Sequence, residues 1–438
     1  MTSVRSMATI KAAAVGFAIA GLLAVATPAA ASGFALREGS ADWMGNAFAG
    51  GTAKAYDAST VWSNPAGMVR LNWNEIDAAA NLILANSKFS GGNTIGGAPT
   101  GGTTGSNLIE PGVTGGLYGV WSFSPSMKFG LSVSSPFGQR VTNPTNFVGR
   151  YQSLVSSISD VQVAIAGAYK INEQWSIGGG PVIDILSARL TQAINLGPLA
   201  PLTGDAVGDL HGSDTAVGFN VGVLYQATPD LRFGADYHSR IQHNISGAQS
   251  ATIPGLVPGL SAATAAFLTA QNSPAATKLT LPDSVTLGVY WQVTPALALL
   301  ADAGWTHWGL LKTINVVPSG AGAQASSLVE GWNDTVALSV GANYQLTESL
   351  MLQGGIGYDQ SPVKASNRST RIPDSDRYLF GVGVQYEAIK NVTLQLAYAH
   401  IVFASASIAN AAAPSAGAIA GSYSNAADTV AFGVKVKF

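Results

Sequence analysis

The 438-residue sequence contains no cysteine. A disulfide framework, a thiolate metal site and a thiol nucleophile are therefore excluded. Charged residues are also scarce, at 11% of the chain, whereas they make up roughly a quarter of soluble domains. Even so, no segment after the N-terminal region has the run of about 18 apolar residues that a membrane-spanning helix needs. Low charge without helical spans is typical of a membrane β-barrel, whose outward and inward residues alternate.

The N-terminal region has the pattern of a secretory signal peptide. Arg5 and Lys11 precede an uncharged run over residues 12–26, and Ala29 and Ala31 offer small side chains to a signal peptidase. The apolar run is too short for a stable membrane anchor. We predict a signal peptide over residues 1–31. The formal net charge of −2 leaves no basic surface for nucleic acid.

Alternating apolar and polar residues bounded by turn residues predict fourteen β-strands. The strands are expected near residues 75–88, 114–123, 127–136, 154–171, 174–195, 210–227, 231–252, 278–293, 297–316, 328–346, 350–360, 377–388, 391–409 and 428–438. Tight connections alternate with long ones rich in glycine, serine, proline and alanine. An even number of strands with short turns on one side and long loops on the other indicates an outer-membrane barrel with both termini in the periplasm.

The last strand shows the two faces of such a wall most clearly. Val430, Phe432 and Phe438 fall on one face, whereas Ala431 and Lys435 fall on the other. Lipid would then contact an apolar face, and small or charged residues would point into the barrel. An ordinary C-terminal edge strand would give the same local pattern.

Residues 32–74 do not alternate like a strand and are too long for a tail. A fourteen-stranded barrel is wide enough to leave a lumen that must be filled or leak. We therefore predict that residues 32–74 form a plug, or hatch, and that residues 75–438 form the barrel. Three apolar residues of the plug, Trp43, Met44 and Phe48, are expected to contact either the lumen wall or a ligand.

One long connection, residues 253–277, contains a stretch that looks helical and amphipathic. Leu260, Phe267 and Leu268 lie on one side of it. It could receive an apolar ligand at the cell surface, or it could merely cap the loops.

At the level of motifs, the chain resembles the FadL family of outer-membrane transporters of long-chain fatty acids and other hydrophobic compounds. The motifs that carry the resemblance are Gly33-Phe34-Ala35-Leu36, Asn64-Pro65-Ala66, Ala168-Tyr169-Lys170-Ile171-Asn172 with Trp175-Ser176-Ile177-Gly178, and Asp359-Gln360-Ser361-Pro362-Val363 followed by Asn367-Arg368 and Ile372-Pro373-Asp374-Ser375-Asp376-Arg377.

The resemblance implies a passive transport route. Gly33, Phe34 and Leu36 would reach into a pocket in the lumen, and Asn64-Pro65-Ala66 would belong to the hatch. A kink in the third strand, at Ser135-Pro136-Phe137-Gly138, would let substrate leave sideways after the N-terminus shifts. Proline inside a strand removes a ladder hydrogen bond, which supports a gap there, although Pro136 could also simply end the strand.

The expected partners follow from the same resemblance. They are outer-membrane lipid and lipopolysaccharide, a hydrophobic small molecule, and the barrel-assembly machinery, which would read the C-terminal strand ending in Phe438. No cofactor is expected.

Substrate chemistry depends on charge in the lumen. Family members that take fatty acids place basic residues near the carboxylate, and the corresponding positions here resemble Gln192 and Asn333, neither of which is charged. A buried cation is costly without an anion, so its absence favours a neutral hydrocarbon. Arg189 near Gln192 could replace it, which keeps fatty acids as candidates.

The remaining charged clusters point to structure rather than chemistry. Arg368, Arg371, Asp374, Asp376 and Arg377 mix both signs on one long loop and are interpreted as a salt-bridged brace. The histidines show no metal-ligand spacing. Two other functions remain open: a general diffusion porin, disfavoured by low charge and a plug, and a barrel hydrolase, for which no triad is found.

Overall fold

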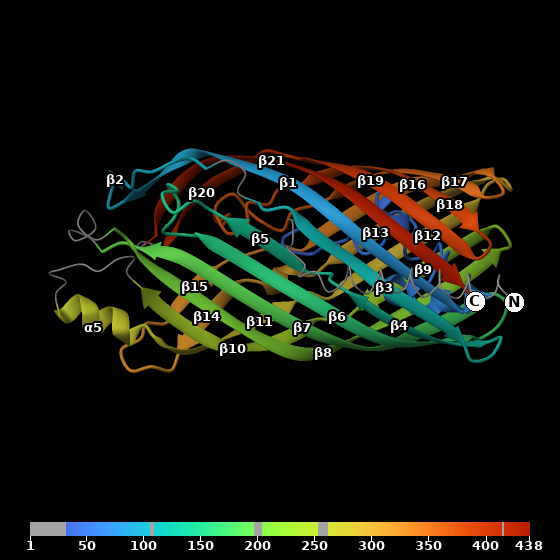
Figure 1. Cartoon of the computed structure of the whole chain (residues 1–438), viewed down its shortest axis with the longest axis horizontal. Helices are drawn as coiled ribbons and strands as arrows, with labels where there is room; N and C mark the ends of the chain where they lie inside the picture. The colour runs from blue at the N-terminus through green and yellow to red at the C-terminus, as the bar shows by residue number, and fades with distance from the viewer. Residues whose placement is uncertain (1–31, 106–108, 197–203, 253–261, 414–415) are drawn as a thin grey trace, which may run out of the picture.

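The computed structural model describes residues 32–105, 109–196, 204–252, 262–413 and 416–438 (Figure 1). The predicted signal peptide and Leu260 lie outside these residues. No helix in the described ranges is both long enough and apolar enough to cross a membrane.

The wall is a closed antiparallel barrel of fourteen strands, as the sequence predicts. Several strands are interrupted and count as two elements. In chain order the strands are β1 (Glu75–Ile95), β3 (Gly112–Ser122), β4 (Met127–Ser134) with β5 (Gly138–Thr142), β6 (Val155–Lys170), β7 (Trp175–Ile194), β8 (Ala206–Thr228), β9 (Leu231–His238) with β10 (Ile241–Thr252), β11 (Ser273–Leu281) with β12 (Ser284–Gln292), β13 (Leu297–Thr306) with β14 (Thr313–Pro318), β15 (Ser326–Val329) with β16 (Thr335–Thr347), β17 (Leu350–Asp359), β18 (Arg377–Ile389), β19 (Val392–Phe403) with β20 (Ala406–Ala413), and β21 (Gly417–Lys437); the short β2 (Ala98–Pro99) pairs with the end of β1.

The first and last strands close the ring. β1 pairs with β21 from Glu75 opposite Lys437 to Thr94 opposite Ala418. Closure is required because backbone N–H and C=O groups have no water to bond with in the bilayer core. Phe432 is half exposed on the outer face, whereas the neighbouring Ala431 is fully buried.

Strands extend further towards the long loops than their apolar patterns suggested. β21 begins at Gly417 rather than near Asp428, and β11 begins at Ser273 rather than near Lys278. Most of these extra residues are small or polar, and Ile419 and Tyr423 are buried, so the ladder continues beyond the lipid-facing band. In Figure 1 the long loops and α5 (Ala262–Ala270) lie at one end of the barrel, and the C-terminus lies at the other, with the short turns.

The chain before the first wall strand is mostly buried from Ser32 to Met68, and Figure 1 shows it inside the barrel. It contains three short helices: α2 (Ala41–Met44), α3 (Thr60–Ser63) and the 3₁₀ helix η1 (Pro65–Arg70). Lys54 and Asp42 form a buried ion pair at 2.7 Å, and Gln353 of β17 donates to Asp42 at 2.8 Å. The hydrogen bond from Gln353 helps to stabilise the buried ion pair, because the attraction between two buried charges alone seldom offsets the cost of removing them from water.

Asn64 fastens this segment to the wall on the other side. Its side-chain amide donates to Thr52 O at 2.8 Å and to Val223 O of β8 at 3.0 Å. Two glycines that face each other in the ladder, Gly178 of β7 and Gly222 of β8, make room for Asn64 and Pro65. A Cβ atom on Gly222 would lie 2.0 Å from Asn64 Oδ1.

Gly222→Ala should therefore unseat the segment over residues 32–74. Overpacking of this kind costs about 1–3 kcal/mol, so we expect a leak through the barrel, measured as increased sensitivity of cells to a bulky hydrophilic antibiotic. Gly167→Ala is the matched control, because a Cβ there meets nothing within 4 Å. Equal sensitivity of the two variants would contradict this seating.

Candidate functional site

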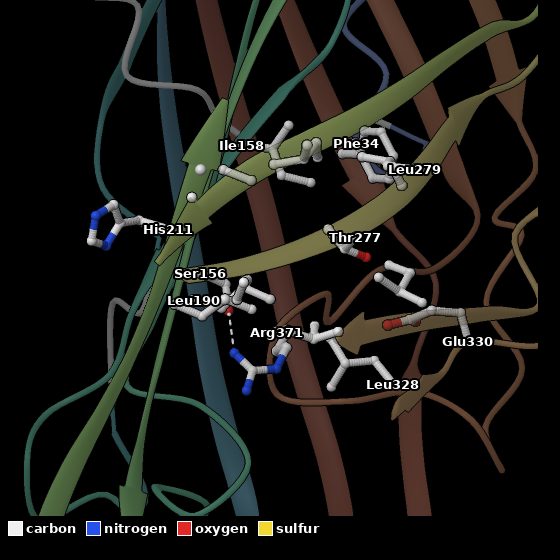
Figure 2. Close-up of a pocket in the computed structure, with 18 of the residues that line it drawn as sticks. Phe34, Ser156, Ile158, Leu190, His211, Thr277, Leu279, Leu328, Glu330 and Arg371 are labelled. Carbon is white, nitrogen blue, oxygen red and sulfur yellow. Dashed lines mark hydrogen bonds between the residues drawn. The ribbon is translucent and has the colours of Figure 1, made fainter. Parts of the chain in front are cut away.

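Two cavities follow one another along the barrel lumen. The outer cavity, near the long loops, is lined mainly by aliphatic side chains, including Ile158, Leu190 and Leu279 (Figure 2). The inner cavity is lined by Trp43, Phe48 and Trp62 of the plug together with wall residues. Of the plug residues singled out in the sequence, Met44 does not line the inner cavity and packs among wall residues instead.

Phe34 lies at the boundary of the two cavities. It lines the outer cavity, and its ring contacts Trp308 at a centroid distance of 4.9 Å, Trp332 at 5.7 Å and Phe137 at 6.0 Å. Trp308 belongs to the 3₁₀ helix η3 (Trp308–Leu310), where strand nine is interrupted. We call Phe34, Phe137, Trp308 and Trp332 the aromatic cluster. It separates the cavities.

The N-terminal segment is held on both sides of Phe34. The Gly33 N–H donates to the Asp374 carboxylate at 2.9 Å. Beyond Phe34, the Leu36 N–H donates to Pro136 O and the Gly138 N–H donates to Phe34 O, both at 2.7 Å. Residues 34–36 therefore pair with the interrupted third strand.

The third strand is broken at the predicted kink, between β4 and β5. β3 pairs with β4 only as far as Gly116 opposite Ser134, and the segment with Pro136 has no ladder partner on β3 among the described residues. On the other side, Asp160 of β6 accepts from the Phe137 N–H at 3.2 Å. Phe34 O and the Leu36 N–H thus form hydrogen bonds with Gly138 and Pro136, whose backbone groups would otherwise pair with a neighbouring strand.

Arg371 supplies the outer cavity with a cation that the sequence interpretation assigned to a loop brace. Its guanidinium donates to Ser156 Oγ at 3.2 Å and to Gln192 Oε1 at 2.6 Å, and the residue is only 6% exposed. No carboxylate forms an ion pair with it in the described ranges. Within the rest of the charge cluster, Arg377 forms an ion pair with Asp374 at 2.5 Å and Arg368 donates to the Asp374 main-chain oxygen at 2.8 Å, whereas Asp376 accepts from Tyr358 and Ser361.

Glu330 lies across the outer cavity from Arg371 (Figure 2). It lies in the connection between β15 and β16, outside the strand ladder. Burial raises the pKa of the Glu330 carboxyl to about 7, against the attraction of Arg371 and the Trp332 indole N–H. Burial also lowers the pKa of Arg371 to about 10, so this side chain stays charged near neutral pH.

Of the three predicted lumen residues, Arg189 and Asn333 lie elsewhere than expected. Arg189 is 59% exposed on the outer face of β7, where it pairs with Asp209 at 2.6 Å. Asn333 is exposed and does not line either cavity. Gln192 is on the inner side, but as the acceptor for Arg371 rather than as a bare polar lining. The expectation that Arg189 supplies a lumen cation is wrong.

Only part of the predicted surface helix can be placed, through Leu268. Leu268 of α5 is buried against Ala206 and Ala251 of the neighbouring strands. This packing is compatible with a helix that caps the loops, and a role in receiving an apolar ligand stays a prediction. The side chain of Phe267 lies outside the described set. Likewise, the described residues contain no group of three or more His, Asp or Glu side chains placed to hold a metal ion.

A closed fourteen-stranded barrel with a plug, two lumen cavities and an apolar outer band defines a class, the plugged outer-membrane transport barrels. Residues 22–438 match the family model described as outer membrane protein transport protein (OMPP1/FadL/TodX). The chain belongs to this family of outer-membrane transporters of hydrophobic compounds.

Relatives in sequence and structure agree with this assignment. The chain is 26% identical over 392 residues to the long-chain fatty acid transport protein of Salmonella typhi, covering 86% of this chain and 89% of the relative. It is 28% identical over 430 residues to outer membrane protein P1 of Haemophilus influenzae, covering 87% and 88%. Among solved structures, a Pseudomonas aeruginosa FadL homologue superimposes with a TM-score of 0.86 and 22% sequence identity, covering 93% of this chain and 100% of the homologue. The toluene transporter TbuX of Ralstonia pickettii superimposes with a TM-score of 0.67 and 17% sequence identity, covering 92% of this chain and 99% of TbuX.

The charge of the outer cavity should change with pH. Below its pKa of about 7 Glu330 is neutral and Arg371 is left with an unbalanced positive charge; above it the ionised carboxylate opposes an anion. We expect a long-chain alkyl sulfonate, whose own charge is constant, to bind more weakly as the pH rises from about one unit below to about one unit above that pKa. Equilibrium binding to the purified protein measures this. Glu330→Gln should abolish the dependence, and an unchanged slope in that variant would refute the assignment.

Proposed function

We propose that this protein takes up long-chain carboxylates, the fatty acids, by passive diffusion. The observation that carries the proposal is Arg371, a buried guanidinium without an ion-pair partner among the described residues, at the edge of a mainly aliphatic cavity that also holds Glu330. A buried cation is costly unless an anion or strong acceptors satisfy it. A carboxylate at Arg371 with its chain along Ile158 and Leu279 would use both features. Relatives named as long-chain fatty acid transport proteins agree with this choice.

The route would lead from the outer cavity to the inner cavity and out through the wall. A chain extending past Leu279 meets Phe34, because both residues line the outer cavity. Displacing Phe34 would open the aromatic cluster and also remove residues 34–36 from the third strand. The break around Pro136 would then lose the groups that cover it, and substrate would leave sideways into the membrane. Residues 32–74 would block the direct path to the periplasm.

A neutral hydrocarbon is the second candidate substrate. The toluene transporter TbuX shares the fold, and most of the outer cavity is apolar. Such a ligand would leave Arg371 without an anion, so it would not depend on that residue. This difference separates the two candidates.

Arg371→Gln should reduce uptake of labelled oleate, and lower its affinity by about tenfold or more, because hydrogen bonds to charged groups contribute about 1.5–3 kcal/mol. Uptake is measured in cells that lack their own transporter and express this chain. Oleyl alcohol should be unaffected, and Arg371→Lys should restore part of the loss. Arg189→Gln is the matched control, since Arg189 is on the outer face.

Oleate uptake that is insensitive to Arg371→Gln would remove Arg371 from the proposal. Uptake of toluene without oleate would assign the protein to neutral hydrocarbons. Uptake of neither by a correctly folded barrel would overturn the proposed function.

Locking the N-terminal segment to the third strand should stop transport. Ala35 and Phe137 face each other as an isolated antiparallel bridge, flanked by the two 2.7 Å hydrogen bonds. Pairs of this non-hydrogen-bonded type have Cα atoms about 4.5 Å apart, within the range for a disulfide. We expect oxidised Ala35→Cys/Phe137→Cys protein to lose oleate uptake and to recover it on reduction. The chain has no other cysteine, and each single variant is a control. Transport that persists in the oxidised form would show that residues 34–36 need not move.

A further inference from the structure

The barrel wall has another break, between the sixth and seventh strands. β8 pairs with β9 from Asn220 to Thr228 and with β10 from Val207 to Ser213. Between these two ladders, residues 214–219 of β8 face residues 239–245 without ladder pairing. Both segments are fully described, so the interruption belongs to the wall itself.

Hydrogen bonds outside the regular ladder join the two segments at both ends of this break. At one end, the Phe219 N–H donates to Ser239 Oγ and the Ser239 N–H donates to Phe219 O, both at 2.9 Å. At the other end, Asp214 accepts from the Asn244 N–H at 3.0 Å. Because unpaired backbone groups are costly next to lipid, these contacts let the strands stay apart without exposing all of their polar groups.

The break lies at the edge of the lipid-facing band. Outward residues of β8 change from His211 and Thr215, which are polar, to Val217, Phe219 and Val221, which are apolar and exposed. The break therefore meets the membrane at the boundary between its outer polar layer and its hydrocarbon core.

The inner cavity reaches this break from within. Its lining includes Trp62 of the plug and also Ser239, Ile241 and Phe219. Phe219 is 48% exposed on the outer face and packs against Tyr237 at 5.9 Å. Ile241 fills the break from inside: a Cβ atom on Gly218 would lie 2.6 Å from its Cγ1 atom. One cavity thus contacts both the plug and a residue of the lipid-facing surface.

We propose that this break is a second lateral opening, through which a hydrophobic ligand passes between the inner cavity and the membrane when Ile241 and Phe219 swing aside. The inference rests on the proposed function, and it adds an opening distinct from the break at Pro136. The side chains that fill the break, Ile241 and Phe219, are apolar and favour passage of an apolar chain, whereas the inner cavity behind them also carries the charged side chains of Arg37, Asp236 and Asp302.

A disulfide across the break tests the opening. A Cβ atom on Gly218 would lie 2.8 Å from Ser239 Oγ, so Gly218→Cys/Ser239→Cys should cross-link. We expect the oxidised form to take up labelled oleate more slowly, with recovery on reduction. Val223→Cys/Ala235→Cys is the matched control, because these residues pair in the intact ladder of the same two strands. Equal uptake by the oxidised and reduced forms of Gly218→Cys/Ser239→Cys would overturn the second opening.

A second measurement does not depend on uptake. Ile241→Cys is exposed to a maleimide dissolved in the lipid of proteoliposomes, with Val182→Cys as control. Val182 lines the same cavity and is equally buried, but it pairs with strands on both sides. Faster labelling of Ile241→Cys supports the opening, and equal or slower labelling contradicts it. If the wild-type protein takes up no oleate, the proposed substrate fails, whereas the labelling result still decides the opening.

Discussion

The structure depends on one constraint: every backbone N–H and C=O of a strand in lipid must find a partner. This requirement closes β1 onto β21, and closure of fourteen strands leaves a lumen that residues 32–74 fill. Because unpaired backbone groups are so costly in lipid, each interruption of the ladder requires other hydrogen-bond partners. At Pro136 the N-terminal segment supplies the missing partners, and between β8 and β10 Ser239 and Asp214 supply them.

The N-terminal segment connects three parts of the site: the charged loop, the aromatic cluster and the broken third strand. Gly33 bonds to the charged loop through Asp374, Phe34 packs in the aromatic cluster, and Leu36 bonds to the broken strand. Any ligand that displaces Phe34 from the outer cavity must therefore act on the backbone bonds beside it. Displacement of Phe34 and loss of the bonds to the third strand are coupled directly, since neighbouring residues of one short segment make all these contacts.

The fold and the general site could be predicted because their signals are local. Alternation along each strand, turn residues and the length of residues 32–74 determine a plugged barrel, and proline at position 136 marks the break. The lumen cation could not be found in this way. Arg371 reaches the outer cavity only because its long loop folds inward, and its partners Ser156 and Gln192 are far away in sequence. Strand alternation alone excludes Arg189 from the lumen face that Gln192 occupies. The two residues are three positions apart, and in a strand an odd separation places side chains on opposite faces.

The sequence by itself determined the membrane environment, the number of strands and the family, because period-two patterning and short motifs are properties of neighbouring residues. Tertiary structure alone decided which charged side chains enter the lumen and that residues 34–36 pair with the third strand. It also decided the interruption between the β8–β9 ladder and the β8–β10 ladder. These features arise between segments distant in the chain, where burial and hydrogen-bond geometry, rather than residue type, select the partners.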